Sequence, residues 1–324
     1  MKALVVESLS PDLSGVSFKT AEKPIAAAGE VTVRVRAASL NYPDLLMTRG
    51  TYQFKPDPPF VSGLEMAGEV VDAPEGFDFN IGDRVRGGAK TGAFAEYIAL
   101  PPRALREMPT GFNFGQAAAF GAAYTTAYVS LCELGRLEKG QTVLVHGASG
   151  GVGLAACDLA KALGATVIAA TNRAEKRGDL LAASKADHII ANTGRFREAV
   201  ETVTGGRLCD LVIDPVGGEV FHESTRCVTF GGKLLVVGFV SGRIPEIAVN
   251  IPLIKGFSIV GVRAGEYSRR FPGRAENMAR TLDNLAEAEK IAPHIDRTLP
   301  IARWREGFEA MAAGELTGKV VFTF

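Results

Sequence analysis

The glycine-rich run Gly147–Ala156, which reads GASGGVGLAA, has the residue types and spacing of a phosphate-binding turn. It lies between an apolar run that ends at His146 and a helical pattern, and Gly151, Gly153 and Ala156 form G-x-G-x-x-A there. In such a turn the glycines permit a tight bend and a close approach to a pyrophosphate, and the helix N-terminus favours the anion. A turn needed only for packing is the alternative. The residues predicted to hold the pyrophosphate are Gly150, Gly151, Val152 and Gly153.

The residues about 20 positions after this turn distinguish the two nicotinamide cofactors, because NAD sites usually carry a carboxylate there for the ribose 2′-hydroxyl. That position is Thr171, and no carboxylate stands at the end of the apolar run. Two cations and two hydrogen-bonding side chains follow, a set that suits a 2′-phosphate. A solvated helix start with ordinary surface charge is the alternative. The sequence favours NADPH, held by Thr171, Asn172, Arg173 and Lys176.

Cysteine and histidine are too scattered to indicate a metal site. The four cysteines contain no C-x-x-C pair, and the four histidines form no H-x-x-x-H or H-E-x-x-H pattern. We therefore expect no metal ligands and interpret the cysteines as small buried hydrophobes. The residues concerned are Cys132, Cys157, Cys209, Cys227, His146, His188, His222 and His294.

Composition excludes several classes of protein. At about 150 residues per domain, the 324 residues suggest two domains. Apolar residues make up 47% of the chain, which excludes a disordered protein, and 36 basic residues balance 36 acidic ones. We therefore expect no nucleic-acid or membrane partner. No apolar run is long enough to span a membrane, and Glu7 comes too early for a secretory signal, so we expect a cytoplasmic protein.

The spacing of apolar residues changes along the chain. Residues 1–118 contain short alternating runs separated by Pro and Gly, which predict a β-rich barrel or sandwich. Residues 119–261 alternate continuous apolar runs with helical stretches, which predicts a doubly wound α/β domain with a parallel sheet. The strands expected in the first zone lie at 31–36, 66–71, 82–85 and 93–98, and those in the second at 142–146, 166–170, 188–190, 211–213, 233–237 and 257–260.

The last zone, residues 262–324, contains helical patterns near 274–289 and 303–313 and ends in the apolar run Lys319–Phe324. A lone terminal strand needs a partner sheet, so we expect it to rejoin the first zone and make the N-terminal domain discontinuous. Asp158 and the polar residues of the helix near 274–289 are expected on solvated faces. Tyr267–Phe271 is expected to be a surface loop, with the mouth of a substrate site as the alternative.

Several motifs together resemble the medium-chain dehydrogenase/reductase superfamily. They are Gly63-Leu-Glu65 before Met66-Ala-Gly68, and Gly82-Asp-Arg-Val85. Within that superfamily the chain resembles the zinc-free quinone oxidoreductase branch, which is zeta-crystallin-like. The motifs that carry this resemblance are Asn41-Tyr-Pro-Asp44, Tyr124-Thr-Thr-Ala127, His146–Gly153 and Gly318-Lys-Val-Val321. The resemblance spans essentially the whole chain. It implies a GroES-like catalytic domain at 1–118 and 262–324, a Rossmann NADPH-binding domain at 119–261, and a homodimer joined through the strand at 257–260.

Departures from the zinc alcohol dehydrogenases indicate which chemistry is favoured. Asn41 stands where those enzymes carry a Cys ligand, and Leu64 stands before Glu65 where they carry a His. The segment Gly121–Tyr124 lies near the third ligand position, and the four-cysteine lobe is missing. Without a Lewis acid, oxidation of plain alcohols is disfavoured. Reduction of a quinone or a conjugated carbonyl needs only hydride delivery and modest stabilisation of the product oxygen.

The resemblance also implies two catalytic candidates. Tyr52 falls where the related enoyl-thioester reductases carry a tyrosine proton donor, so its phenol is expected to bond the substrate oxygen. Packing on a loop with an exposed hydroxyl is the alternative. Asn41 is expected to bond the nicotinamide ribose or carboxamide. Its alternative is the start of a helix, because Pro43 and Asp44 are typical of a first turn.

Further cofactor contacts follow from the resemblance. Thr126 matches a threonine beside the nicotinamide, with a hydroxyl bonded to its own helix backbone as the alternative. Asn192 follows the third Rossmann strand, where relatives place a tyrosine near the adenine end. The loop after the fifth strand flanks the nicotinamide in this family, and Phe239 in it is alternatively a core residue. The loop residues are Gly238, Phe239 and Val240.

These observations together predict an NADPH-dependent, zinc-independent oxidoreductase of the quinone oxidoreductase type, acting on a small quinone or conjugated carbonyl. Two alternatives stay open. One is an enoyl- or acryloyl-thioester reductase acting on a 2-enoyl-CoA. The other is an NADPH-binding protein with little turnover.

Overall fold

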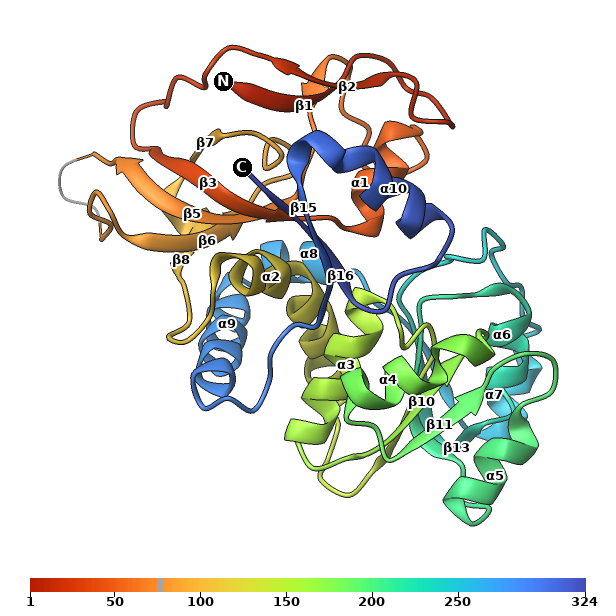
Figure 1. Ribbon diagram of the computed structural model, residues 1–324. Helices are drawn as coiled ribbons and strands as arrows, with labels where there is room; N and C mark the ends of the chain where they lie inside the picture. Colours follow the sequence, from red (N-terminus) through yellow and green to blue (C-terminus); the bar gives the residue numbers. More distant parts are fainter. Residues whose placement is uncertain (75–77) are drawn as a thin grey trace. The chain divides into compact units, whose positions relative to one another are not determined.

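The computed structural model describes residues 1–74 and 78–324, and the chain divides into two units (Figure 1). Unit 1 comprises Met1–Ala122 and Pro293–Phe324, and unit 2 comprises Ala123–Ala292. The first boundary lies close to the expected one at residue 118. The chain re-enters unit 1 at Pro293, later than the expected residue 262. The segment 262–292 therefore belongs to unit 2. Over the described ranges, no helix is long and apolar enough to cross a membrane.

Unit 1 is built on two β-sheets. The smaller has the order β2-β1-β4 and consists of β1 (Lys2–Val6), β2 (Val16–Thr20) and β4 (Phe60–Val61). The larger has the order β15-β16-β3-β5-β6-β8, with β7 paired to β3. Its strands are β3 (Val31–Ser39), β5 (Glu65–Asp72), β6 (Arg84–Gly88), β7 (Tyr97–Leu100), β8 (Leu105–Glu107), β15 (Ile295–Pro300) and β16 (Lys319–Thr323). The alternation predicted for β3 is confirmed at Val33 to Val35, where Arg34 is exposed between two buried valines, but not at Thr32, which is buried too.

The expected strand at 93–98 is only partly correct. The strand begins at Tyr97, and Ala95 makes an isolated bridge to Ala3. The preceding Phe94 instead enters the core of unit 1, where its ring meets that of Phe322 edge-on at 5.3 Å between centroids. The helices of unit 1 are α1 (Tyr42–Thr48) and α10 (Trp304–Ala312), with short 3₁₀ turns η1 (Pro102–Ala104) and η4 (Ile301–Arg303).

The C-terminal strand rejoins the N-terminal sheet, as the sequence predicted. β16 pairs antiparallel with β3, with Val321 opposite Ser39, and the blue β16 runs beside β3 in Figure 1. On its other side β16 pairs parallel with β15. The residues Lys319–Phe322 are all buried. Strand pairing therefore carries Lys319 into the interior of unit 1, beside residues from the start of the chain.

Unit 2 contains the predicted parallel sheet, with the order β11-β10-β9-β12-β13-β14. Its six strands are β9 (Thr142–Val145), β10 (Thr166–Thr171), β11 (His188–Ala191), β12 (Cys209–Asp214), β13 (Val228–Val236) and β14 (Ser258–Gly261). The first strand lies in the middle and the order reverses beside it, which is the doubly wound arrangement. The helices between the strands are α3 (Gly151–Ala162), α4 (Arg177–Ser184) after the 3₁₀ turn η3 (Ala174–Lys176), α5 (Arg197–Thr204), α6 (Gly218–Ser224) and α7 (Asn250–Lys255).

Continuous apolar strands require cover on both faces, and the core of unit 2 shows it. Leu144, Ile168 and Val212, register partners on one face of the sheet, are 0% exposed, and so are Val143 and Val145 on the other face of β9. The interpretation of the cysteines as buried hydrophobes is confirmed for Cys157, Cys209 and Cys227, which are also 0% exposed; Cys132 is half-buried.

The segment 262–292 lies in unit 2 because its helices bond to that unit. Helix α2 (Phe114–Tyr128) continues into the π-helical turn η2 (Val129–Leu134), which contains Glu133. Tyr267 on α8 (Ala264–Arg270) donates its hydroxyl to Glu133 at 2.5 Å, and Arg274 on α9 (Pro272–Glu287) lies 3.3 Å from the same carboxylate. The prediction of a surface loop at Tyr267–Phe271 is therefore wrong. The periodicity of apolar residues can indicate a helix in this segment, but it cannot show which part of the chain the helix contacts.

Candidate functional site

The glycine turn leads directly from β9 into α3. Gly147 has φ +57°, a conformation that favours glycine, and Gly150 caps the helix. A Cβ on Gly153 would lie 2.3 Å from the Gly147 carbonyl oxygen, so only glycine lets α3 pack this closely on the turn. The four predicted pyrophosphate residues therefore occupy the cap and the first turn of α3, where the backbone N–H groups lack intrahelical partners. This arrangement fits an anionic diphosphate.

The turn after β10 lies next to the glycine turn, because Ala148 donates its backbone N–H to Ala170 at 3.3 Å. Thr171 is buried, and its hydroxyl oxygen accepts the N–H of Arg173 at 3.2 Å. Arg173 lies 3.8 Å from the exposed Glu175. Lys176 is buried as well, at 6% exposed. Asn172 is exposed. The structure thus brings the four residues predicted to select NADPH to one turn.

Asn192 lies beside this turn, since its backbone N–H bonds the Thr171 carbonyl at 3.2 Å. Its side-chain Nδ2 lies 3.2 Å from His146 Nδ1, and His146 Nε2 lies 2.8 Å from Ser224 Oγ. The single hydroxyl proton of Ser224 is directed to Val220 O, so Nε2 carries the imidazole proton and Nδ1 accepts from Asn192.

Burial lowers the pKa of His146 to about 3, so the ring stays neutral and orients Asn192 instead of acting as a base. Asn192 is 5% exposed, and its Oδ1 has no hydrogen-bond partner among the residues described. A buried acceptor without a partner is costly and fits a ligand that donates, such as an adenine amino group or a ribose hydroxyl. The sequence identified Asn192 but not the His146 and Ser224 side chains behind it.

The loop after β13 lies beside the loop after β12, because Val240 donates its N–H to Pro215 O at 3.0 Å. Phe239 is 39% exposed, so the alternative of a core residue is wrong for it, and Val240 is 51% exposed. Gly238 leaves room for this approach, since its Cβ would lie 3.4 Å from Pro215 O. These residues add an apolar surface to the carboxyl edge of the sheet, where open α/β folds bind ligands.

Asp214, at the end of β12, was not singled out in the sequence. It is 0% exposed, and its Oδ1 accepts the N–H groups of Val216 and Gly217 at 2.8 and 2.9 Å. Burial raises the pKa of this carboxyl. Its function is to order the loop after β12 against which residues 238–240 pack. The sequence feature that could have identified Asp214 is its position, a carboxylate directly at the end of an apolar strand.

In unit 1, the Asn41 amide is almost fully occupied. Its Nδ2 donates to Ser39 O at 3.1 Å and to Glu65 Oε1 at 2.9 Å, and its Oδ1 accepts from Lys319 Nζ at 2.6 Å. Both donor protons are used, so Asn41 can meet a ligand only as an acceptor. The alternative interpretation as a helix start is confirmed, because Asp44 Oδ2 accepts the Asn41 N–H at 2.8 Å and α1 begins here.

Lys319 brings an ammonium group to this cluster. Its ammonium lies 3.1 Å from Glu65 Oε1, and the two side chains are 6% and 8% exposed. Glu65 Oε2 also accepts the N–H of Ala122 at 2.8 Å. Burial raises the pKa of Asp44 to about 8, so Asp44 is protonated at neutral pH. The motif Gly318-Lys-Val-Val321 contains Lys319, but no local pattern indicates its partners, which lie near the other end of the chain.

The donor set around Asn41 does not fit zinc. A catalytic zinc needs three Cys, His or carboxylate ligands. Here the positions of the Cys and His ligands hold an amide and Leu64, and the cation next to Glu65 is the Lys319 ammonium. Within residues 1–74 and 78–324, no group of three or more His, Cys, Asp or Glu side chains is arranged to hold a metal ion.

The last two predicted residues belong to different units. Tyr52 lies in unit 1, in the irregular segment after α1. It is half-buried, and its hydroxyl has no hydrogen-bond partner in the described part of the chain, so it is available to a ligand. Thr126 lies on α2 in unit 2, half-buried, and its carbonyl accepts the Ser130 hydroxyl at 2.7 Å.

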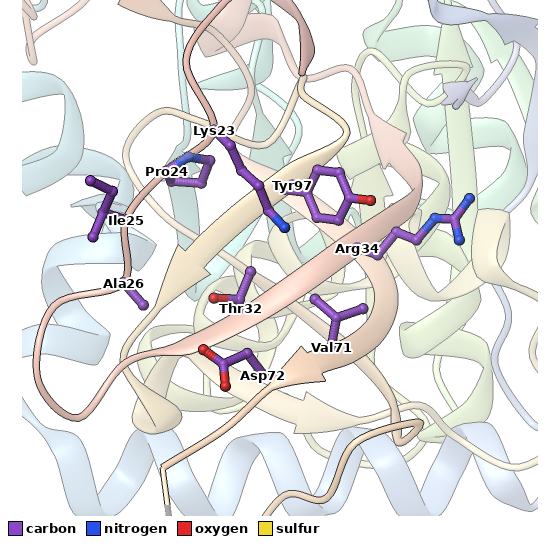
Figure 2. Close-up of a pocket in the computed structure, with 9 residues that line it drawn as sticks. All are labelled: Lys23, Pro24, Ile25, Ala26, Thr32, Arg34, Val71, Asp72 and Tyr97. Atoms are coloured by element: carbon purple, nitrogen blue, oxygen red, sulfur yellow. The ribbon is translucent and has the colours of Figure 1, made fainter.

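A groove of about 450 Å³ lies on the outer face of the unit 1 sheet (Figure 2). Lys23 crosses it with its ammonium 4.0 Å from the centre of the Tyr97 ring. The groove is lined by Lys23, Pro24, Ile25, Ala26, Thr32, Arg34, Val71, Asp72 and Tyr97. None of these is a predicted site residue.

The fold and the site together define a GroES-like unit joined to a dinucleotide-binding unit of the Rossmann type. Residues 27–110 match the alcohol dehydrogenase GroES-like domain, and residues 151–281 match the domain described as a zinc-binding dehydrogenase. The chain is 36% identical over 299 residues to a quinone oxidoreductase-like protein 2 homolog of Nematostella vectensis, covering 90% of this chain and 81% of that protein.

Two solved structures are similar over the full length of the chain. A probable oxidoreductase of Mycobacterium abscessus has a TM-score of 0.91 and 34% identity, with 100% of this chain and 99% of that chain covered. A quinone oxidoreductase of Thermus thermophilus, solved also in complex with NADPH, has a TM-score of 0.84 and 30% identity, with 100% of both chains covered. The protein therefore belongs to the quinone oxidoreductase branch of the medium-chain dehydrogenase/reductase superfamily.

Proposed function

We propose that the protein is an NADPH-dependent, zinc-independent reductase that delivers hydride to a quinone or another conjugated carbonyl. The observation that carries this proposal is the pair of adjacent turns in unit 2. The glycine turn at the start of α3 suits a pyrophosphate, and the turn that holds Thr171, Arg173 and Lys176 suits a 2′-phosphate. The NADPH complex of the Thermus thermophilus relative supports the same cofactor.

The residues of unit 2 have distinct functions in this proposal. The N–H groups of Gly151, Val152 and Gly153 bind the pyrophosphate, and Arg173 and Lys176 pair with the 2′-phosphate. Further contacts come from Asn192, whose Oδ1 accepts from the adenosine moiety, from Thr126 beside the nicotinamide, and from Phe239 and Val240, which exclude water at the reacting end. When bound, the cofactor supplies a hydride from nicotinamide C4.

Unit 1 supplies the polar groups for the acceptor. Tyr52 is the proposed donor to the substrate oxygen, because its hydroxyl is available and no metal polarises that oxygen in this proposal. Asn41 uses its remaining lone pair to accept from the nicotinamide carboxamide or ribose. A quinone or enone is already electron-poor, so a single phenol donor and correct positioning suffice.

The test is a survey of NADPH oxidation by purified protein with three classes of acceptor: quinones, enones and 2-enoyl-CoA thioesters. We expect turnover of quinones or enones, unchanged after exhaustive chelation of metals. A marked preference for enoyl-CoA would establish the thioester reductase instead. Tight binding of NADPH without turnover of any acceptor would establish a binding protein, and loss of activity together with stoichiometric zinc would overturn the zinc-free mechanism.

A further inference from the structure

Asp158 lies on the nucleotide-binding helix α3 but faces inward. The expectation of a solvated position is wrong, because the residue is only 4% exposed. Its Oδ2 accepts two hydrogen bonds, from the Tyr124 hydroxyl at 2.7 Å and from the Ala292 backbone N–H at 2.9 Å. Its Oδ1 pairs with Lys185 Nζ at 2.7 Å. A buried carboxylate with this many partners joins several elements.

The two residues on Oδ2 come from the two places where the chain passes between units. The chain enters unit 2 at Ala123, next to Tyr124, and leaves it after Ala292. One carboxylate oxygen therefore binds a group from each crossing. Tyr124 is 1% exposed, and burial raises its pKa well above the usual value, so its hydroxyl remains a hydrogen-bond donor.

The same helix carries the proposed cofactor site at its N-terminus. Asp158 lies about two turns along α3 from Gly151. The helix is continuous from Gly151 to Ala162, so it connects the first turn directly to the carboxylate. The proposed reaction uses Tyr52 of unit 1 together with the cofactor residues of unit 2, and the two crossings are the covalent links between these units.

We propose that Asp158 is a positioning residue that fixes both chain crossings to the nucleotide-binding helix. Binding of the dinucleotide at the start of α3 then orders the crossings, and turnover depends on them although Asp158 touches neither cofactor nor substrate. This inference rests on the proposed function. It predicts that weakening the contacts of Asp158 lowers kcat much more than it lowers NADPH affinity.

The first experiment compares Tyr124→Phe with Tyr128→Phe. Both changes remove one hydroxyl from the same helix α2, but the Tyr124 hydroxyl bonds Asp158 and the Tyr128 hydroxyl does not. We expect Tyr124→Phe to lower kcat about tenfold or more, because a small misplacement of the reacting groups slows the chemical step by at least this factor. Its dissociation constant for NADPH should stay within about threefold, since the phosphate-binding turns are untouched. Tyr128→Phe should leave both quantities unchanged.

The second experiment uses the geometry of the carboxylate. In Asp158→Asn, an amide oxygen placed toward Tyr124 and Ala292 leaves the NH₂ group facing the Lys185 ammonium, which is repulsive. Adding Lys185→Met removes that ammonium, so the double variant should recover kcat lost in Asp158→Asn. Hydrogen exchange gives a readout independent of turnover. NADPH should slow exchange of the Ala292 amide in the wild type and fail to do so in Asp158→Asn.

The outcomes separate this inference from the proposed function. If wild-type protein neither binds NADPH nor reduces any acceptor, the proposed function fails. If the wild type is active but Tyr124→Phe and Asp158→Asn keep full kcat, the positioning inference fails alone. It also fails if kcat, NADPH affinity and melting temperature fall together in these variants, because that pattern describes general loss of structure.

Discussion

Tyr52 is the residue whose chemistry matters most to the proposed mechanism. Its available hydroxyl can donate to the substrate oxygen as charge develops there. Tyr52→Phe should lower kcat by about 10²–10³-fold, the usual effect of losing such a donor. The loss should be larger for enones, whose enolates need a proton, than for quinones, whose reduced oxygens are readily solvated. Steady-state kinetics with NADPH affinity as the control measures this, and an unchanged kcat on every acceptor would show that Tyr52 only packs.

Lys319 is predicted to stabilise unit 1 because it neutralises a buried carboxylate. Lys319→Met removes the ammonium that lies 3.1 Å from the buried Glu65 carboxylate, which should cost about 3–5 kcal/mol of unfolding free energy. The double variant Lys319→Met with Glu65→Gln removes both charges and should recover most of that loss. Urea unfolding of the three proteins measures the effect. Equal stability of the single variant and the wild type would contradict it.

Asp44 predicts a pH dependence with a definite sign. Its pKa is raised to about 8 by burial, whereas an unfolded aspartate titrates near pH 4. The folded state therefore binds more protons between these values, and its stability relative to Asp44→Asn falls by up to about 1.4 kcal/mol per pH unit as pH rises through that window. Urea unfolding from pH 5 to 9 tests this. A constant difference between the two proteins would exclude a neutral Asp44.

At the scale of elements, the turn after β10 determines cofactor preference. Arg173→Ala with Lys176→Ala should weaken NADPH binding by about 10²-fold, because two charge-assisted contacts to the 2′-phosphate are lost. Binding of NADH, which lacks that phosphate, should change little. Lys161→Ala is a matched control, since Lys161 is a cation at the far end of α3 that pairs with Asp187. Fluorescence titration gives the constants, and equal wild-type affinity for both cofactors would contradict the assignment.

Elements were predictable from sequence where local patterns determine them. Alternation marked β3, continuous apolar runs marked the strands of unit 2, and the glycine spacing marked the turn before α3. Long-range polar contacts were not predictable, because no local pattern carries them. Lys319 and Asn41 lie 278 positions apart, and Asp158 meets Ala292 across 134 positions. Periodicity also could not show that α8 and α9 belong to unit 2, since an amphipathic helix does not specify its partner.

At the scale of the whole molecule, the edge strand β14 of the unit 2 sheet is a candidate site for association with another chain. β14 is an edge strand, and unpaired edges favour pairing with another chain unless they are covered or charged. Large apolar side chains in residues 230–254, the segment that precedes β14, are exposed instead of buried. They are Phe230 at 85%, Ile244 at 75%, Val249 at 84%, Leu253 at 79% and Ile254 at 76%. Phe230 lies against Gly256 at the end of α7, which brings it next to the helix that carries Leu253 and Ile254.

We propose a second copy of this chain as the partner of that edge, because two β14 strands related by a two-fold axis extend the sheet and cover these side chains together. Light scattering at micromolar concentration should therefore give the mass of a dimer. Leu253→Glu with Ile254→Glu should give a monomer, since four carboxylates would meet in an apolar interface. Ile25→Glu is the control, because Ile25 is 96% exposed in unit 1 and should leave the dimer intact. A monomeric wild type would refute the assembly, and a double variant that stays dimeric would move the interface to another surface.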